Sequence, residues 1–161
     1  MNNMSNNNSK GYWTDEKQRK YDNMYLDIAK RVSEMSYCKK LKVGCVVVRG
    51  GRILSMGWNG TPKGFDNCCE IEGETVDEVI HAEENAIAKL AKSTDTSNKA
   101  TVYSTLAPCV ECAKLMIQAG IVRVIFLKRY RYDAGVDLLR DSGIFVIDLG
   151  SEHQNKLKER F

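Results

Sequence analysis

The chain has 161 residues, of which 43% are hydrophobic and 28% are charged. These proportions are typical of one globular domain with its own hydrophobic core, and they exclude a low-complexity or fibrous protein. The formal net charge of +3 is too small for a protein that binds nucleic acid mainly through its charge. We therefore expect no nucleic-acid partner, whereas a small anionic substrate is compatible with this charge.

The chain also lacks the signals of a membrane or secreted protein. No apolar stretch approaches the roughly 20 residues that a membrane helix needs. The N-terminal segment is polar, so we expect residues 1–12 to be disordered or frayed, and it contains no signal-peptide core. The expected location is the cytoplasm, without a membrane partner. There the six cysteines favour metal ligation or free thiols over disulfides.

The first half of the chain predicts a helix, a hairpin and a long loop. Apolar residues recur at three- and four-residue steps over residues 14–35, which predicts an amphipathic helix with Thr14 as a suitable N-cap. Two β-branched runs, 43–48 and 52–58, flank a glycine pair, and this pattern predicts a β-hairpin. Residues 59–79 form a polar loop of a length that is more often functional than idle.

The second half alternates between helical and strand patterns. The expected elements are a helix over 81–91, a strand over 101–106, a helix over 109–119, a strand over 122–127, a helix over 136–142, a strand over 144–149 and a terminal helix over 151–161. Strands that alternate with helices after a hairpin predict parallel pairing and helices on both sheet faces. The expected fold class is α/β, with three α/β/α layers around a five-stranded mixed sheet. Residues 13–161 would form a single domain.

Three side chains in the middle of the chain are typical zinc ligands: His81, Cys109 and Cys112. The two cysteines are three residues apart at a predicted helix start, so both sulfurs lie on one face. Three protein ligands leave a fourth position for a water, which zinc makes nucleophilic near neutral pH. Glu83 follows the histidine closely enough to move the protons. The pattern predicts hydrolytic attack on an electron-poor carbon.

Two other interpretations of this cluster stay open. A structural zinc site needs a fourth ligand, which Cys68 or Cys69 could provide, and the chain would then be a zinc-stabilised binding module without activity. A redox CxxC pair would leave His81 and Glu83 without a role. The cysteines outside the cluster are expected to be free thiols, with a second zinc site as the alternative. They are Cys38, Cys45, Cys68 and Cys69.

The sequence around the predicted ligands resembles the cytidine and deoxycytidylate deaminase family. The resemblance rests on His81-Ala82-Glu83 and Pro108-Cys109-Val110-Glu111-Cys112, and on segments 42–44, 57–62, 81–87 and 105–109, which are similar to phage-type dCMP deaminases. It implies a cytidine-deaminase-like fold and the hydrolysis of dCMP to dUMP and ammonia, in pyrimidine deoxynucleotide synthesis. Glu83 would take a proton from the zinc-activated water, protonate N3 of the base and help ammonia leave.

The resemblance also implies nucleotide contacts. The implied substrate contacts are Val43, Cys45 and Asn59, and the implied effector site consists of Gly57, Trp58, Asn59 and Gly60. The effectors would be dCTP as activator and dTTP as inhibitor, with Mg²⁺ beside the bound triphosphate. Taken without the resemblance, Asn59 favours a tight turn and Trp58 favours a place in the core.

A basic and aromatic run over 128–133 follows the strand expected at 122–127, at the sheet end where ligands bind in α/β proteins. Tyr132 is the substrate contact that we predict in this run, and a solvated surface is the alternative. The resemblance further implies a homo-oligomer, with a hexamer as the expected size, and the host cytoplasm if a phage encodes the chain. A tRNA adenosine deaminase is the alternative within the superfamily, although the weak net charge argues against it.

Overall fold

The computed structural model describes residues 16–151. Its elements are α2 (Glu16–Ser33), β1 (Gly44–Arg49), β2 (Arg52–Trp58), β3 (Glu70–Ile71), β4 (Glu74–Thr75), α3 (Ala82–Leu90), β5 (Thr101–Leu106), α4 (Val110–Gln118), β6 (Arg123–Lys128), α5 (Ala134–Asp141) and β7 (Phe145–Asp148). This order agrees with the predicted one, except that the expected loop contains the β3–β4 hairpin. The predictions for residues 1–12, the Thr14 cap and the terminal helix beyond Ser151 lie outside the described residues.

Five of the strands form one mixed sheet in the order β2-β1-β5-β6-β7. Strand β1 is antiparallel to β2 and β5, whereas β5, β6 and β7 run parallel. Parallel neighbours need a crossover connection, and α4 and α5 provide the two crossovers. The expectation of an α/β fold with a five-stranded mixed sheet is confirmed. None of the helices within residues 16–151 has the length and apolar character needed to cross a membrane.

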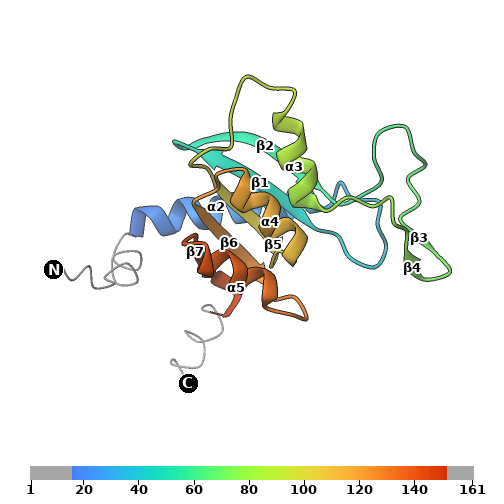
Figure 1. The fold of residues 1–161 in the computed structure, drawn as a ribbon. Helices are drawn as coiled ribbons and strands as arrows, with labels where there is room; N and C mark the ends of the chain where they lie inside the picture. Colours follow the sequence, from blue (N-terminus) through green and yellow to red (C-terminus); the bar gives the residue numbers. More distant parts are fainter. Residues whose placement is uncertain (1–15, 152–161) are drawn as a thin grey trace.

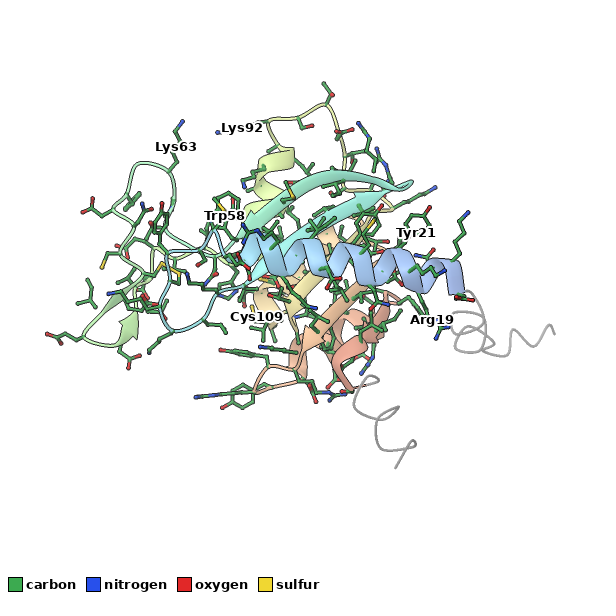
Figure 2. All side chains as sticks on the ribbon, turned by 180° about the vertical axis from the view of Figure 1, so that it is seen from behind. Arg19, Tyr21, Trp58, Lys63, Lys92 and Cys109 are labelled. Atoms are coloured by element: carbon green, nitrogen blue, oxygen red, sulfur yellow. A yellow bond between two sulfur atoms is a disulfide. The ribbon has the colours of Figure 1, made fainter. Side chains whose placement is uncertain are left out.

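The two faces of the sheet carry separate apolar clusters, because side chains alternate along each strand. Val46 and Tyr103 belong to the cluster that packs under α2. Val47 and Val102, their immediate neighbours, belong to the cluster that packs against α3, α4 and α5. Figure 1 shows these three helices on one side of the sheet, and Figure 2, seen from behind, shows α2 across the other side. The expected three layers are therefore present.

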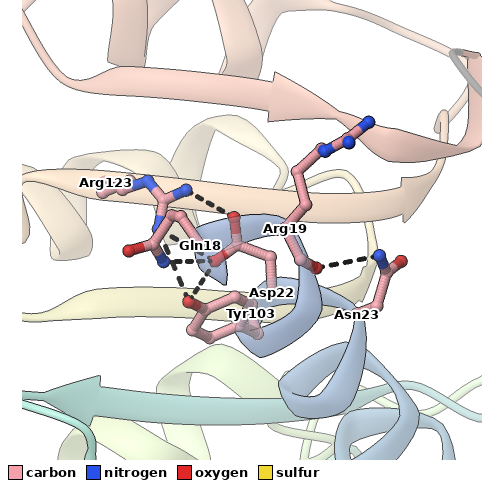
Figure 3. Close-up of polar contacts among 6 residues, drawn as sticks. All are labelled: Gln18, Arg19, Asp22, Asn23, Tyr103 and Arg123. Carbon is pink, nitrogen blue, oxygen red and sulfur yellow. Dashed lines mark hydrogen bonds and ion pairs between the residues drawn. The ribbon is translucent and has the colours of Figure 1, made fainter. Parts of the chain in front are cut away.

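A buried carboxylate fastens α2 to the middle of the sheet (Figure 3). Asp22 is fully buried, and Arg123 donates to its Oδ2 at 2.6 Å and to its Oδ1 at 2.9 Å. The Tyr103 hydroxyl and the Gln18 amide donate to Oδ1 at 2.6 and 3.1 Å. These hydrogen bonds offset the cost of burying the charge. They fix the position of α2 across β5 and β6.

Asp22→Ala is expected to lower the free energy of unfolding by about 3–5 kcal/mol, because Arg123 would keep a largely buried charge without its carboxylate. Urea denaturation measures this loss. The matched control is Asp27→Ala on the same helix, whose carboxylate pairs with Lys30 at an exposed position. That variant should lose less than about 1 kcal/mol. Equal losses in the two variants would contradict a central role for Asp22.

Cys38 and Cys69 form a disulfide, with their Cα atoms 5.1 Å apart. This bond corrects the expectation that both would be free thiols or ligands of a second zinc. The two residues are 31 positions apart, and the sequence pattern did not indicate that the segment after α2 meets the start of β3. Cys45 and Cys68 are free thiols, as expected. The disulfide therefore joins the chain before β1 to the β3–β4 hairpin.

Candidate active site

Two helix N-termini bring the predicted metal ligands together. His81 is the N-cap of α3, Cys109 is the N-cap of α4, and Cys112 lies in the first turn of α4. His81 Nδ1 lies 3.3 Å from Cys112 Sγ and 3.4 Å from Cys109 Sγ. Tetrahedral zinc, with bonds of about 2.1 Å to nitrogen and 2.3 Å to sulfur, places these atoms about 3.6 Å apart. The three side chains therefore fit one zinc ion.

The surroundings of Cys109 and Cys112 would also stabilise a bound cation. Burial raises the pKa of the Cys112 thiol, and the charges of Glu83 and Cys109 raise that pKa further. The N-terminus of α4 favours thiolates, and Cys109 Sγ accepts a hydrogen bond from Cys112 N at 3.5 Å. A zinc ion would supply the positive charge that keeps both sulfurs deprotonated. Within residues 16–151 no second group of His, Cys, Asp or Glu could hold a metal.

Glu83 lies beside the cluster and is 4% exposed. Its Oε1 accepts a hydrogen bond from the Ser104 hydroxyl at 2.8 Å, and its Oε2 lies 3.7 Å from Cys112 Sγ. Burial raises the pKa of this carboxyl, although its own backbone N–H and the Ser104 hydroxyl partly oppose the shift. A raised pKa makes it easier for a carboxyl to hold a proton and return it in a later step. The position and the direction of this shift are compatible with a role of Glu83 in proton transfer.

A cavity of about 170 Å³ opens onto this cluster. His81, Glu83 and Cys109 contribute to its lining, and Val43 and Leu106 are among its apolar lining residues. A small apolar cavity with a few convergent polar groups is typical of a site for a small molecule. The geometry therefore supports hydrolysis of a small substrate placed over the metal.

The structure brings only some of the predicted substrate contacts to this cavity. Val43 and Asn59 line it, whereas Cys45 is fully buried in the core and is not part of the described lining. Tyr132 is 73% exposed and lies outside the described lining, while Tyr130 is part of it. The basic and aromatic run was correctly placed near the site. Its loop, however, brings the earlier tyrosine to the cavity.

The side chain of Asn59 is used to build the cavity wall. Its Oδ1 accepts from Val43 N at 2.8 Å, and its Nδ2 donates to Leu41 O at 2.8 Å. These two bonds tie the segment before β1 to the end of β2. Asn59 thus has a structural role that neither the turn interpretation nor the substrate interpretation included.

Three of the four residues of the predicted effector segment border a second groove, of about 370 Å³. Trp58, Asn59 and Gly60 line this groove together with Lys63 and Lys89. The Lys89 ammonium lies 4.2 Å from the centroid of the Trp58 ring, a cation–π contact. Trp58 also packs against the cluster under α2, as its core interpretation expected.

Gly57 lies outside this described groove lining and has a packing role. A Cβ atom at this position would collide with the Ala82 carbonyl oxygen and the Ala86 nitrogen on α3. The glycine therefore permits the close approach of β2 and α3 that positions His81 at the start of the helix.

Three residues that the sequence analysis missed also shape the cavity. Ser104 holds Glu83 from β5, and Lys40 and Tyr130 line the cavity from two loops. Ser104 lies in an ordinary buried strand, so no local pattern marks it. The one signal near it is the family resemblance, because Ser104 immediately precedes Thr105, the first residue of the similar segment 105–109.

Comparisons with known proteins agree with this geometry. The family model for the cytidine and deoxycytidylate deaminase zinc-binding region matches residues 19–128. The chain is 32% identical to the deoxycytidylate deaminase of Enterobacteria phage T4, and the match covers 82% of this chain and 91% of that relative. A crystal structure of the dCMP deaminase from cyanophage S-TIM5, in complex with dCMP and dUMP, has a TM-score of 0.78 and 42% identity. It covers 80% of this chain and 96% of its own.

The purified protein is expected to contain about one zinc ion per chain, bound by three side chains. Cys112→Ser should reduce the zinc content to below about a tenth, because a hydroxyl is a poor replacement for a thiolate ligand. Elemental analysis by mass spectrometry measures both proteins. Cys68→Ser is the control, since Cys68 is an exposed free thiol and should not affect zinc. An equal loss in Cys68→Ser would indicate a closed structural site with four ligands.

Proposed function

Because the chain belongs to the cytidine and deoxycytidylate deaminase family, we propose that it hydrolyses dCMP to dUMP and ammonia. The observation that carries this proposal is the His81, Cys109 and Cys112 cluster beside buried Glu83. His81, Glu83 and Cys109 line one small cavity. The phage relatives named deoxycytidylate deaminase support dCMP as the substrate. The reaction would serve pyrimidine deoxynucleotide synthesis in the cytoplasm, and residues 13–161 would form the single catalytic domain.

The arrangement assigns a separate task to each group. Zinc, when bound, supplies the Lewis acidity that makes a water nucleophilic near neutral pH. Glu83 accepts a proton from the water that attacks C4 of cytosine and delivers it to N3. It then takes the proton of the hydroxyl group now on C4 and passes it to the amino group, which leaves as ammonia. Ser104 binds Oε1 of Glu83, which leaves Oε2 for these transfers. Val43 and Leu106 line an apolar space that limits the access of other waters.

Glu83→Gln is expected to keep its zinc and lose at least about 100-fold in turnover of dCMP, because an amide cannot carry the protons. Ammonia release is measured with dCMP, cytidine, cytosine and an adenosine stem-loop, and zinc by elemental analysis. Glu111→Gln is the matched control, since Glu111 is exposed and pairs with Lys114, and it should deaminate dCMP normally.

The substrate panel separates the proposed function from its alternatives. Preferred turnover of dCMP by the unmodified protein supports the proposal. Turnover of the stem-loop alone would identify a tRNA adenosine deaminase. A fully zinc-loaded protein without turnover of any substrate would be a binding module. Deamination retained in Glu83→Gln would overturn the assignment of the proton carrier.

We also propose that the groove lined by Trp58, Asn59 and Gly60 binds nucleotide effectors, dCTP as activator and dTTP as inhibitor, each with Mg²⁺. Two lysines and an indole ring in one groove suit a triphosphate and a base. Asn59 also lines the substrate cavity and holds its wall. One residue shared by two sites gives a physical route for coupling them. A homo-oligomer, with a hexamer as the expected size, is part of the same proposal.

Adding dCTP is expected to lower the dCMP concentration that gives half-maximal rate, and adding dTTP is expected to raise it. Lys89→Ala should weaken both responses, because it removes a cation from the groove. Rates are measured over a range of dCMP concentrations at fixed effector concentrations. Lys114→Ala, exposed on α4, is the control and should respond normally. Hyperbolic rates that neither nucleotide changes would overturn the effector proposal.

A further inference from the structure

The substrate cavity is lined by few charged side chains, and carboxylates outnumber lysines and arginines among them. Among the described residues that line it, Lys40 is the one lysine or arginine, and Glu70 and Glu83 are the two carboxylates. A phosphate monoester carries about −1.5 to −2 charges at pH 7. A nucleotide in this cavity therefore needs a cation to offset its phosphate, and the two carboxylates must not repel it.

Both carboxylates already have partners. Glu83 is held by Ser104 beside the metal cluster. Glu70 Oε1 accepts hydrogen bonds from the backbone N–H groups of Lys39 and Lys40, at 3.0 and 3.1 Å. Two successive amides that converge on one oxygen form an anion-binding nest, which compensates part of the carboxylate charge. Glu70 is thus bound to the backbone, and the Lys40 side chain is not its partner.

The Lys40 ammonium has only a weak partner in the described structure. Its Nζ lies 3.7 Å from Glu74 Oε2, and the two side chains are 51% and 90% exposed. An ion pair with this exposure contributes little to stability, since water and salt compete for both charges. Exchanging Glu74 for a doubly charged phosphate would therefore cost little.

The backbone around Lys40 is held at several points, so the cation starts from a fixed place. Cys38 is bonded to Cys69, and the Leu41 carbonyl accepts from Asn59. The Lys40 amide itself donates to Glu70. A charged group on an anchored segment loses less conformational entropy on binding a ligand than one on a mobile loop.

We propose that Lys40 binds the 5′-phosphate of the substrate and thereby selects nucleotides over nucleosides. The proposal rests on the proposed deamination of dCMP and adds the residue that recognises the phosphate. Glu70 acts as a positioning residue, because it holds the peptide segment that carries Lys40. The neighbouring Lys39 has the same charge but is exposed and lies outside the described cavity lining.

The test compares Lys40→Ala with its neighbour Lys39→Ala. Steady-state kinetics with dCMP and with deoxycytidine are measured for both variants, together with inhibition of dCMP turnover by dUMP and by deoxyuridine. Lys40→Ala should raise KM for dCMP and the inhibition constant of dUMP roughly 10- to 100-fold, the range for losing a hydrogen bond to a charged group. Its kcat at saturating dCMP and its response to deoxycytidine and deoxyuridine should not change.

Two controls separate recognition from general effects. Lys39→Ala loses the same charge and should behave like the unmodified protein, and Lys40→Arg should retain most of the affinity for dCMP. An unchanged KM for dCMP in Lys40→Ala, or equal effects of the two alanine variants, would overturn the proposal. A parallel loss with deoxycytidine would show that Lys40 is only structural. Failure of the unmodified protein to deaminate dCMP would instead contradict the proposed function. It is told apart from failure of the Lys40 proposal because it needs no variant.

Discussion

The structure of the site depends on one electrostatic constraint: two cysteine sulfurs and a buried carboxylate lie within a few ångströms of one another. Burial disfavours negative charge on these groups and raises the pKa of both Glu83 and Cys112. The charges of Glu83 and Cys109 raise the pKa of Cys112 further. A divalent cation and two helix N-termini remove this conflict. The sheet holds the N-termini of α3 and α4 close together. The close approach of β2 and α3 at Gly57 contributes to this arrangement.

Hydrogen bonds from side chains to backbone groups assemble the walls of the cavity. Asn59 binds two backbone groups of the segment before β1, and Glu70 binds two more from the β3–β4 hairpin. Each contact satisfies polar backbone groups that no regular strand or helix would pair. The same side chains therefore hold the cavity wall together and fix the positions of the residues beside them. Asn59 both stabilises the wall and lines the cavity, so its structural role and its contact with the cavity are not alternatives.

Much of the fold follows from local patterns, because alternation and helical periodicity report directly on which side of a strand or helix is buried. The approach of His81 to Cys109 and Cys112 could be predicted because each of these residues lies at or near an expected helix start. Ser104, Lys40 and Tyr130 depend instead on which strands are neighbours and on how loops turn, and no local pattern records that. The Cys38–Cys69 bond was missed for the same reason, and an expectation drawn from the cellular compartment pointed the other way. Tyr130, and not the predicted Tyr132, is among the described lining residues of the cavity, because the place of a loop along the chain does not reveal which of its side chains faces the cavity.

The β3–β4 hairpin extends away from the main sheet (Figure 1). Its bonds to the rest of the protein include the disulfide and the Glu70 contacts, and its strands pair only with each other. Insertions or deletions between residues 61 and 79 would therefore leave the register of the five-stranded sheet unchanged. Thr75 and Val79 nevertheless line the substrate cavity. Changes of length or sequence in this segment can therefore alter the wall of the substrate cavity while the five-stranded sheet and the predicted zinc ligands stay in place.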